Sequence, residues 1–133
     1  MSFFEIIAAA LRNYVNFTGR ATRAEYWYWT LPIGIINIVL GIADERLNPG
    51  TSFGALSWVT MIVFLATALP TIAVSIRRLH DIDCSGRWLL LWLTVIGGLV
   101  LVYWACRPGT PGPNRFGPPT TNLHPSVAQQ AAL

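Results

Sequence analysis

The sequence is poor in charge, and this absence narrows the class of protein at once. Only 11% of its 133 residues are charged and 53% are hydrophobic, with a mean hydropathy of +0.49. A soluble domain carries about a quarter charged residues. Three stretches contain no lysine, arginine, aspartate or glutamate at all: residues 26–43, 55–76 and 88–106. A small soluble domain cannot hide three helices that are apolar on every side, so a soluble fold is excluded.

Side chains that carry reaction or metal chemistry are also scarce. The chain has 2 cysteines and 2 histidines, and Cys84 and Cys106 lack the spacing of a metal motif. His80 stands beside Asp81, but neither a nucleophile nor a second cluster with ligand spacing accompanies the pair. We therefore predict that the protein is not an enzyme and holds no metal or other cofactor.

The position of the positive charge argues against nucleic acid as a partner. The net charge of +3 lies at the ends of the apolar stretches. Membrane orientation and contact with lipid headgroups explain charge in such positions. Nucleic acid is therefore not an expected partner.

The sequence contains apolar stretches that are long enough to cross a membrane. A helix rises ~1.5 Å per residue, so roughly 20 apolar residues cross a hydrocarbon core of ~30 Å. We expect an all-α integral membrane protein, with one helical membrane domain over residues 1–119. Its three transmembrane helices are predicted at 26–43, 55–76 and 88–106.

The two ends of the chain differ from the apolar stretches. Residues 3–16 are too short to cross a membrane, but they place Glu5, Arg12 and two asparagines opposite an apolar side. This pattern predicts an interfacial amphipathic helix in the headgroup layer. The proline-rich end of the chain shows no apolar periodicity, and we expect residues 120–133 to form a disordered tail.

Two topologies remain open for the third stretch. With three full crossings, the N-terminus shares one side with Arg12, Arg20, Arg23, Arg77, Arg78 and Arg87, and the other side holds Arg46, Arg107 and Arg115. If Gly97 and Gly98 instead bend the stretch back as a re-entrant hairpin, Arg107 and Arg115 join the N-terminal side. Both topologies place the N-terminus in the cytoplasm, because arginine accumulates there. We prefer three full spans, because protein must shield a re-entrant backbone at membrane depth.

The charged residues gather in the joints between the apolar stretches. The candidate binding residues are Arg20, Arg23, Arg77, Arg78, His80, Arg87 and Arg115, and the acids available to pair with them are Glu25, Asp81 and Asp83. One interpretation is a structural network of ion pairs that ties the first helix to the spans. The other is a site for an anionic phospholipid headgroup, because arginine binds phosphate through two parallel hydrogen bonds. The two interpretations are compatible.

A glycine-rich and proline-rich segment follows the third stretch. Residues 109–117 lack the lysine and the serine or threonine that end a phosphate-binding P-loop. We predict instead a rigid turn. It would carry Arg115 and Phe116 back onto the membrane surface or onto the other helices.

The joints together resemble a known family. The segments NYVNFTGRATRAEYW at 13–27, RRLHD at 77–81, SGRW at 85–88 and GTPGPNRFGP at 109–118 occur in this order. In order and spacing they resemble the YhaH-like family of small bacterial inner-membrane proteins, a domain of unknown function. The resemblance covers roughly residues 5–119. It implies a multi-pass location in the bacterial inner membrane and no established activity.

These observations lead to two expectations about function. The first is a non-enzymatic accessory or scaffold component that binds anionic lipid or a larger membrane complex through its arginine-rich cytoplasmic face. The alternative is a subunit of a small homo-oligomeric channel or transporter. It ranks second because the apolar stretches hold no ionisable residue of the kind that marks an ion pathway.

Overall fold

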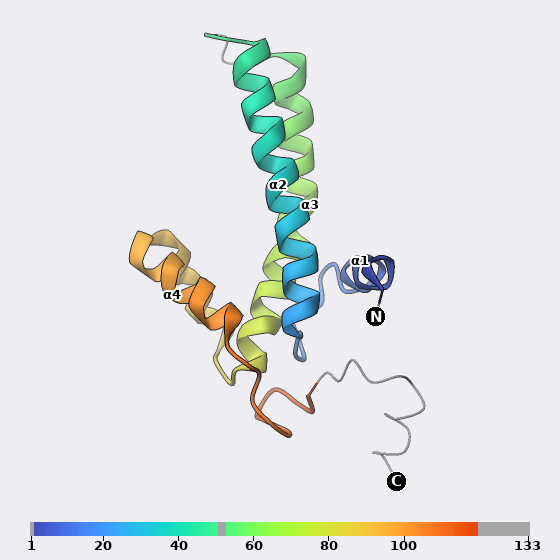
Figure 1. The fold of residues 1–133 in the computed structure, drawn as a ribbon, viewed down its shortest axis with the longest axis vertical. Helices are drawn as coiled ribbons and strands as arrows, with labels where there is room; N and C mark the ends of the chain where they lie inside the picture. Colours follow the sequence, from blue (N-terminus) through green and yellow to red (C-terminus); the bar gives the residue numbers. More distant parts are fainter. Residues whose placement is uncertain (1, 51–52, 120–133) are drawn as a thin grey trace.

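The computed structural model describes residues 2–50 and 53–119, and every regular element in them is helical. Two long helices form an upright hairpin, and three shorter helices surround one end of it (Figure 1). The one extended pairing in this part of the chain is an isolated bridge between Asn114 and Gly117. The expected tail at 120–133 lies outside the described residues.

The hairpin consists of α2 (Arg23–Leu47) and α3 (Ala55–Asp81). At ~1.5 Å per residue each helix exceeds the ~30 Å of a hydrocarbon core, and both are apolar enough to cross a membrane. Helix α2 begins where the Thr22 hydroxyl accepts the Glu25 backbone N–H at 3.1 Å, so Thr22 is its N-cap. The first two apolar stretches are thus confirmed as long helices.

The outer surface of the hairpin is apolar. Ile38, Val39, Ile62 and Leu65 are between 58% and 63% exposed. A contiguous apolar surface of this extent marks a membrane or protein contact rather than a face held in water.

The third apolar stretch is not one helix. It forms a 3₁₀ helix, η1 (Gly86–Leu93), and a short α-helix, α4 (Val95–Cys106), with Thr94 extended between them. We call residues 86–106 the arm. The Thr94 hydroxyl accepts the Gly97 N–H at 3.0 Å and donates to the Leu91 carbonyl at 3.1 Å. Gly97 is required here, because a Cβ atom would overlap the Leu91 carbonyl oxygen.

Both ends of the arm lie at the same end of the hairpin. Its start follows the end of α3 after the short segment 82–85. At its end, the Arg78 guanidinium of α3 donates to the Ala105 carbonyl at 3.2 Å, and the Thr110 N–H donates to the Asp81 carbonyl at 2.7 Å. The prediction of a third full span over 88–106 is therefore not confirmed. The chain bends at Thr94, three residues before the Gly97–Gly98 pair at which the re-entrant alternative placed the bend.

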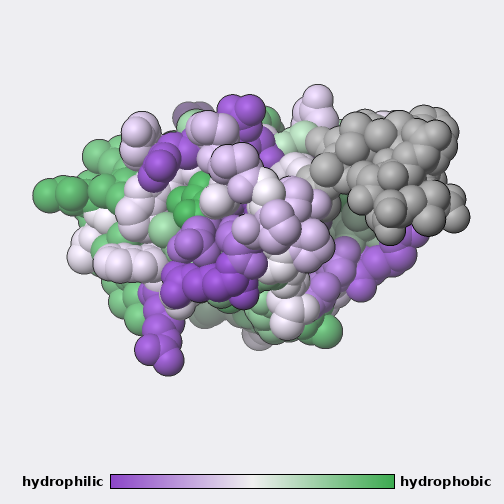
Figure 2. Space-filling model, turned by 90° about the horizontal axis from the view of Figure 1, so that it is seen from below, coloured by the Kyte–Doolittle hydropathy of each residue, from purple (hydrophilic) through white to green (hydrophobic). Residues whose placement is uncertain are grey.

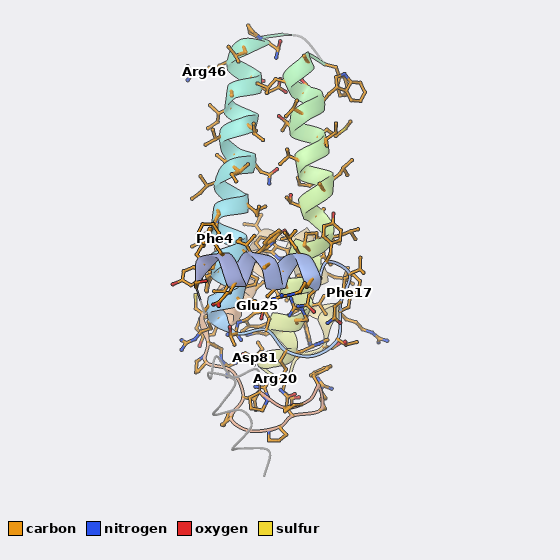
Figure 3. The ribbon with its side chains drawn as sticks, turned by 90° about the vertical axis from the view of Figure 1, so that its right-hand side faces the viewer. Phe4, Phe17, Arg20, Glu25, Arg46 and Asp81 are labelled. Carbon is orange, nitrogen blue, oxygen red and sulfur yellow. The ribbon has the colours of Figure 1, made fainter. Side chains whose placement is uncertain are left out.

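The N-terminal helix is shorter than expected. Helix α1 (Phe3–Arg12) ends because both the backbone and the side-chain amide of Asn13 bind the Ala9 carbonyl. The helix runs across the hairpin near its lower end (Figures 1 and 3). It buries Ile6 and Ala10, while Phe4 is 80% exposed. The predicted helix at 3–16 is therefore too long, because residues 13–16 belong to the loop that follows α1.

The packed core lies where the helices meet at this end. It contains Ala10, Ala21, Tyr26, Trp29, Val74 and Ala105, one or more from each long helix, from α1 and from α4. The Trp29 indole N–H donates to the Thr71 hydroxyl at 3.1 Å, which links α2 to α3. This core holds the charged joints in fixed positions.

Candidate functional site

The charged joints gather at the lower end of the hairpin. We call this region the arginine end. It comprises the loop 13–22, the first turn of α2, the last turn of α3 and the segment 107–119. Seen from this side, hydrophilic side chains form several patches separated by weakly polar ones, and apolar side chains lie mainly at the margins (Figure 2). Segments far apart in the sequence therefore share one polar face.

Arg20 is buried in the middle of this face. Only 4% of it is exposed, and its Nε donates to the Asp81 carboxylate at 2.9 Å. Its terminal nitrogens donate to the carbonyls of Gly112 at 2.8 Å and Thr110 at 2.6 Å. The side chain thus joins the loop before α2 to the end of α3 and to the chain after the arm.

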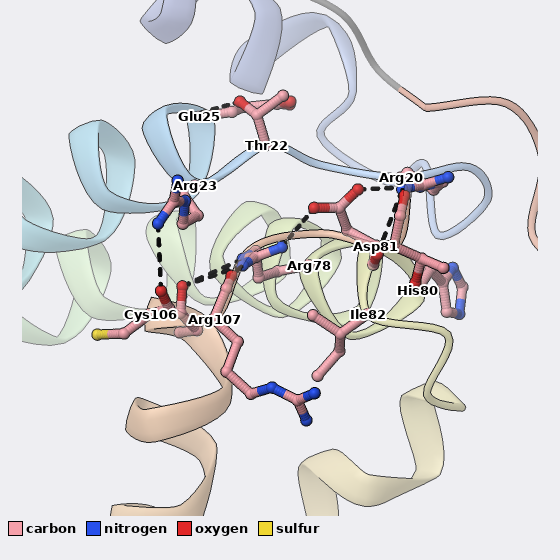
Figure 4. Close-up of polar contacts among 12 residues, drawn as sticks. Arg20, Thr22, Arg23, Glu25, Arg78, His80, Asp81, Ile82, Cys106 and Arg107 are labelled. Carbon is pink, nitrogen blue, oxygen red and sulfur yellow. Dashed lines mark hydrogen bonds and ion pairs between the residues drawn. The ribbon is translucent and has the colours of Figure 1, made fainter. Parts of the chain in front are cut away.

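Arg78 binds the other oxygen of the same carboxylate. It is 2% exposed and donates to Asp81 Oδ2 at 2.5 Å (Figure 4). Its remaining nitrogens donate to the carbonyls of Ala105 and Arg107. A cation in this position satisfies the last carbonyls of α4 and complements the negative end of its dipole.

Arg77 forms the third buried ion pair. Its guanidinium donates to Glu25 Oε1 at 2.7 Å, and both side chains are more than nine-tenths buried. The Arg77 carbonyl also accepts the Ala21 N–H at 3.0 Å. These bonds tie the end of α3 to the start of α2. Removing one partner from a buried pair costs about 3–5 kcal/mol, so these contacts hold the fold.

His80 is enclosed by the chain on both sides. Its Nδ1 lies 2.9 Å from the Gly19 carbonyl, and its ring stacks on Phe116 with centroids 3.9 Å apart. The Asn114 amide donates to the His80 carbonyl at 2.9 Å. The turn at 109–117 therefore docks on α3. Of the two placements expected from the sequence, the membrane surface or the other helices, this is the second.

The remaining predicted site residues are exposed. Arg115 lies 3.3 Å from Asp83, a pair in which both side chains are about half exposed. Arg87 is exposed at the start of η1. Arg23 is exposed too, and within residues 2–50 and 53–119 its one polar contact is a 3.4 Å bond to the Cys106 carbonyl. Arg23 therefore carries a positive charge without a carboxylate partner in the described chain.

Arg23 stands between two surface hollows. One, of about 430 Å³, is lined by Arg23, Thr22 and Thr110 among others. The second, of about 400 Å³, is lined by Arg23 together with Trp27 and Tyr28. Aromatic rings beside a basic side chain are typical of the membrane–water interface.

Sequence reasoning missed several residues that shape this end. Arg107 is exposed, and its carbonyl accepts from Arg78. Gly109 faces the Asp81 carboxylate so closely that a Cβ atom would overlap it. The glycine-rich motif marked a turn at this position, but no sequence signal indicated which side chain it would meet.

The arrangement separates the candidate residues by burial. Arg20 and Arg78 are held by a carboxylate and by carbonyls, and Arg77 is held by the Glu25 carboxylate, although its buried Nε has no hydrogen-bond partner among the described residues. The bound nitrogens of these three arginines can reach a ligand only by breaking contacts that hold the fold. The exposed arginines are the ones available to bind phosphate or carboxylate groups. In the part of the chain that the structure describes, no group of three or more histidine, cysteine, aspartate or glutamate side chains is placed to hold a metal ion.

Comparison with known proteins agrees with the resemblance noted in the joints. The inner membrane protein YhaI of Escherichia coli K12 is 44% identical over 110 residues, which cover 82% of this chain and 89% of YhaI. The inner membrane protein YhaH of the same strain is 46% identical over 109 residues, covering 81% of this chain and 89% of YhaH. No solved structure matches the chain. Residues 14–118 match the family described as protein of unknown function (DUF805), and the chain belongs to that family.

Proposed function

We propose that this protein is a non-enzymatic accessory component of the bacterial inner membrane that binds anionic phospholipid through its arginine end. The observation that carries the proposal is Arg23, which is exposed, lacks a carboxylate partner in the described chain and lies beside Trp27 and Tyr28. A guanidinium at headgroup level forms two parallel hydrogen bonds with a phosphate. The neighbouring aromatic rings suit the same layer of the membrane.

The distribution of charge supports a cytoplasmic position for this end. Because the arm returns to its starting side, Arg107 and Arg115 lie with Arg20, Arg23, Arg77, Arg78 and Arg87. The far end of the hairpin carries Arg46 beside Asp44 and Glu45. Arginine-rich ends of spans remain in the cytoplasm, where the leaflet also holds anionic lipid.

Both the buried network and the exposed arginines carry excess positive charge. The buried network sets Arg20, Arg77 and Arg78 against Glu25 and Asp81. The exposed Arg23 and Arg107 add positive charge next to this network. An anionic headgroup at either arginine would offset that charge, and each such arginine contributes about 1 kcal/mol to binding at an anionic surface.

The test is lipid retention by the double variant Arg23→Gln/Arg107→Gln. Protein in nanodiscs of phosphatidylethanolamine with a minor share of phosphatidylglycerol is extracted into mild detergent, and bound lipid is quantified by native mass spectrometry. The wild type should retain phosphatidylglycerol preferentially. The double variant should lose about fivefold in this preference for each arginine removed, because ~1.4 kcal/mol corresponds to tenfold.

The matched control is Arg46→Gln, which removes an arginine from the opposite end of the hairpin. It should leave the preference unchanged. Equal retention by the double variant and the wild type would contradict the proposal. A protein that co-purifies in stoichiometric amount in place of lipid would assign the arginine end to a partner complex and would likewise overturn lipid binding.

A further inference from the structure

The described elements are distributed unevenly along the hairpin. Helix α1 lies on one side of the lower half of the hairpin, and the arm lies on another (Figures 1 and 3). The upper half, up to the turn that follows Leu47, shows only α2 and α3. The cross-section of the described chain is therefore much larger at the arginine end than at the far end.

The arm is built for apolar surroundings. Leu90, Leu93, Val95, Ile96 and Leu99 are between 68% and 86% exposed. An apolar surface of this kind is stable when hydrocarbon covers it. The arm starts at the arginine end of the hairpin and returns to the same end. The groups that cover its apolar surface are therefore the acyl chains of the adjoining leaflet.

The bend of the arm tolerates hydrocarbon. Polar backbone groups at membrane depth must be satisfied within the protein. Here the Thr94 N–H donates to the Leu91 carbonyl at 3.0 Å, and the Thr94 carbonyl accepts the Gly98 N–H at 3.0 Å. The Thr94 hydroxyl donates to the Leu91 carbonyl before the bend and accepts from the Gly97 N–H after it. The polar groups of Thr94 are thus bonded within the arm itself, without help from a neighbouring helix.

The length of the arm limits its depth. Helix α4 has 12 residues, so at ~1.5 Å per residue it reaches about 18 Å, little more than half of a ~30 Å core. The arm therefore occupies mainly one leaflet. The same leaflet meets α1, whose Phe3, Phe4 and Leu11 are 47% to 80% exposed.

We infer that the protein is a one-sided membrane wedge that sorts to curved membrane. The protein takes up more volume in the leaflet at the arginine end than in the other leaflet, which only two helices cross. It therefore favours regions where the leaflet at the arginine end is convex. The protein would therefore concentrate in membrane whose convex side is the side of the arginine end. This inference rests on the membrane placement proposed above, but it does not depend on the binding of anionic lipid.

The test measures how the full-length protein distributes between a giant vesicle and a nanotube pulled from it. The lipid is zwitterionic phosphatidylcholine, so a failure of anionic lipid binding leaves the result untouched. A Thr18→Cys substitution in a background with Cys84→Ser and Cys106→Ser accepts an impermeant dye at the arginine end. Dye added from outside labels only the molecules that present this end outward.

We expect these labelled molecules to be denser on the tube than on the vesicle, with a ratio that rises as the tube narrows. Molecules labelled from outside at the far end, through Glu45→Cys in the same background, should be depleted on the tube. A ratio of one at every tube radius would overturn the inference. So would equal enrichment of the two orientations, because a wedge must distinguish them.

A pair of variants assigns the effect to the arm. Leu90→Ala, Leu93→Ala and Ile96→Ala together remove exposed volume from the arm, and they should move the ratio toward one. The matched control removes exposed volume from the hairpin through Ile38→Ala, Val39→Ala and Ile62→Ala, and it should not move the ratio toward one, because it narrows the far end and leaves the arm intact. Equal ratios for both variants would show that the arm is not the wedge.

Discussion

At the scale of single residues, burial divides the arginines into two roles. A buried guanidinium must find acceptors for its donors, because an unpaired charge in the protein interior is costly. Arg20 and Arg78 share the two oxygens of Asp81, and Arg77 pairs its charge with Glu25 while its Nε stays without an acceptor among the described residues. Exposed arginines such as Arg23 keep their binding capacity. The charge of a residue in the sequence does not reveal which role it takes.

Asp81 is the residue on which this network depends most. Asp81→Asn removes the negative charge that two buried arginines share, so we expect a loss of about 3–5 kcal/mol in the free energy of unfolding. The measurement is thermal unfolding of the purified protein in detergent, followed by tryptophan fluorescence.

The neighbouring acid supplies the control for this prediction. Asp83→Asn removes a carboxylate whose pair with Arg115 is about half exposed, and such pairs contribute about 0–1 kcal/mol. Asn also tolerates the positive φ of 60° at this position. Similar destabilisation by both substitutions would refute the central role of Asp81.

At the scale of elements, sequence reasoning predicted the hairpin and missed the form of the arm. Residues 26–43 and 55–76 mark most of α2 and α3, because apolar length is the property that membrane helices require. Both helices extend beyond these runs into the charged joints. Their ends depend on caps such as Thr22 and on buried ion pairs, and hydropathy does not detect either feature.

The break in the arm has no hydropathy signal, since Thr94 is a single weakly polar residue within 88–106. Gly97 and Gly98 drew attention to the correct region. However, Gly97 acts as a point of close approach and not as the bend. The pairing of the joints was equally hidden, because Arg77 meets Glu25 across 52 residues and Arg20 meets Asp81 across 61. The sequence predicted the members of the network but not all of its pairs.

Gly97→Ala tests the geometry of the bend. The added methyl group would overlap the Leu91 carbonyl oxygen and the Thr94 hydroxyl, and crowding of this kind costs about 1–3 kcal/mol. Hydrogen exchange should become faster around residues 94–98, and the midpoint of thermal unfolding should fall.

Gly41→Ala is the matched control, because nothing lies within 4 Å of the position where its Cβ would stand. In a helix interior this change favours the helix by up to about 1 kcal/mol. A midpoint that falls equally in both variants would indicate that the close contact at Gly97 is not the cause.

At the scale of the whole molecule, one feature organises the rest. The arm returns the chain to the end from which it left, and this brings 107–119 against the loop 13–22 through Arg20 and His80. The shared polar face depends on that return, and so do the proposed lipid site and the proposed wedge. With a third full span, the two segments would lie on opposite sides of the membrane.

The most direct test is therefore the side on which three single cysteines lie, each in a background with Cys84→Ser and Cys106→Ser. Thr18→Cys, Pro118→Cys and Glu45→Cys place a thiol at exposed positions in the loop before α2, after the arm and at the far end of the hairpin. An impermeant maleimide is added to spheroplasts and to inverted membrane vesicles. We predict that Thr18→Cys and Pro118→Cys react together in inverted vesicles and that Glu45→Cys reacts in spheroplasts. Labelling of Pro118→Cys with Glu45→Cys, on the side opposite Thr18→Cys, would contradict the account.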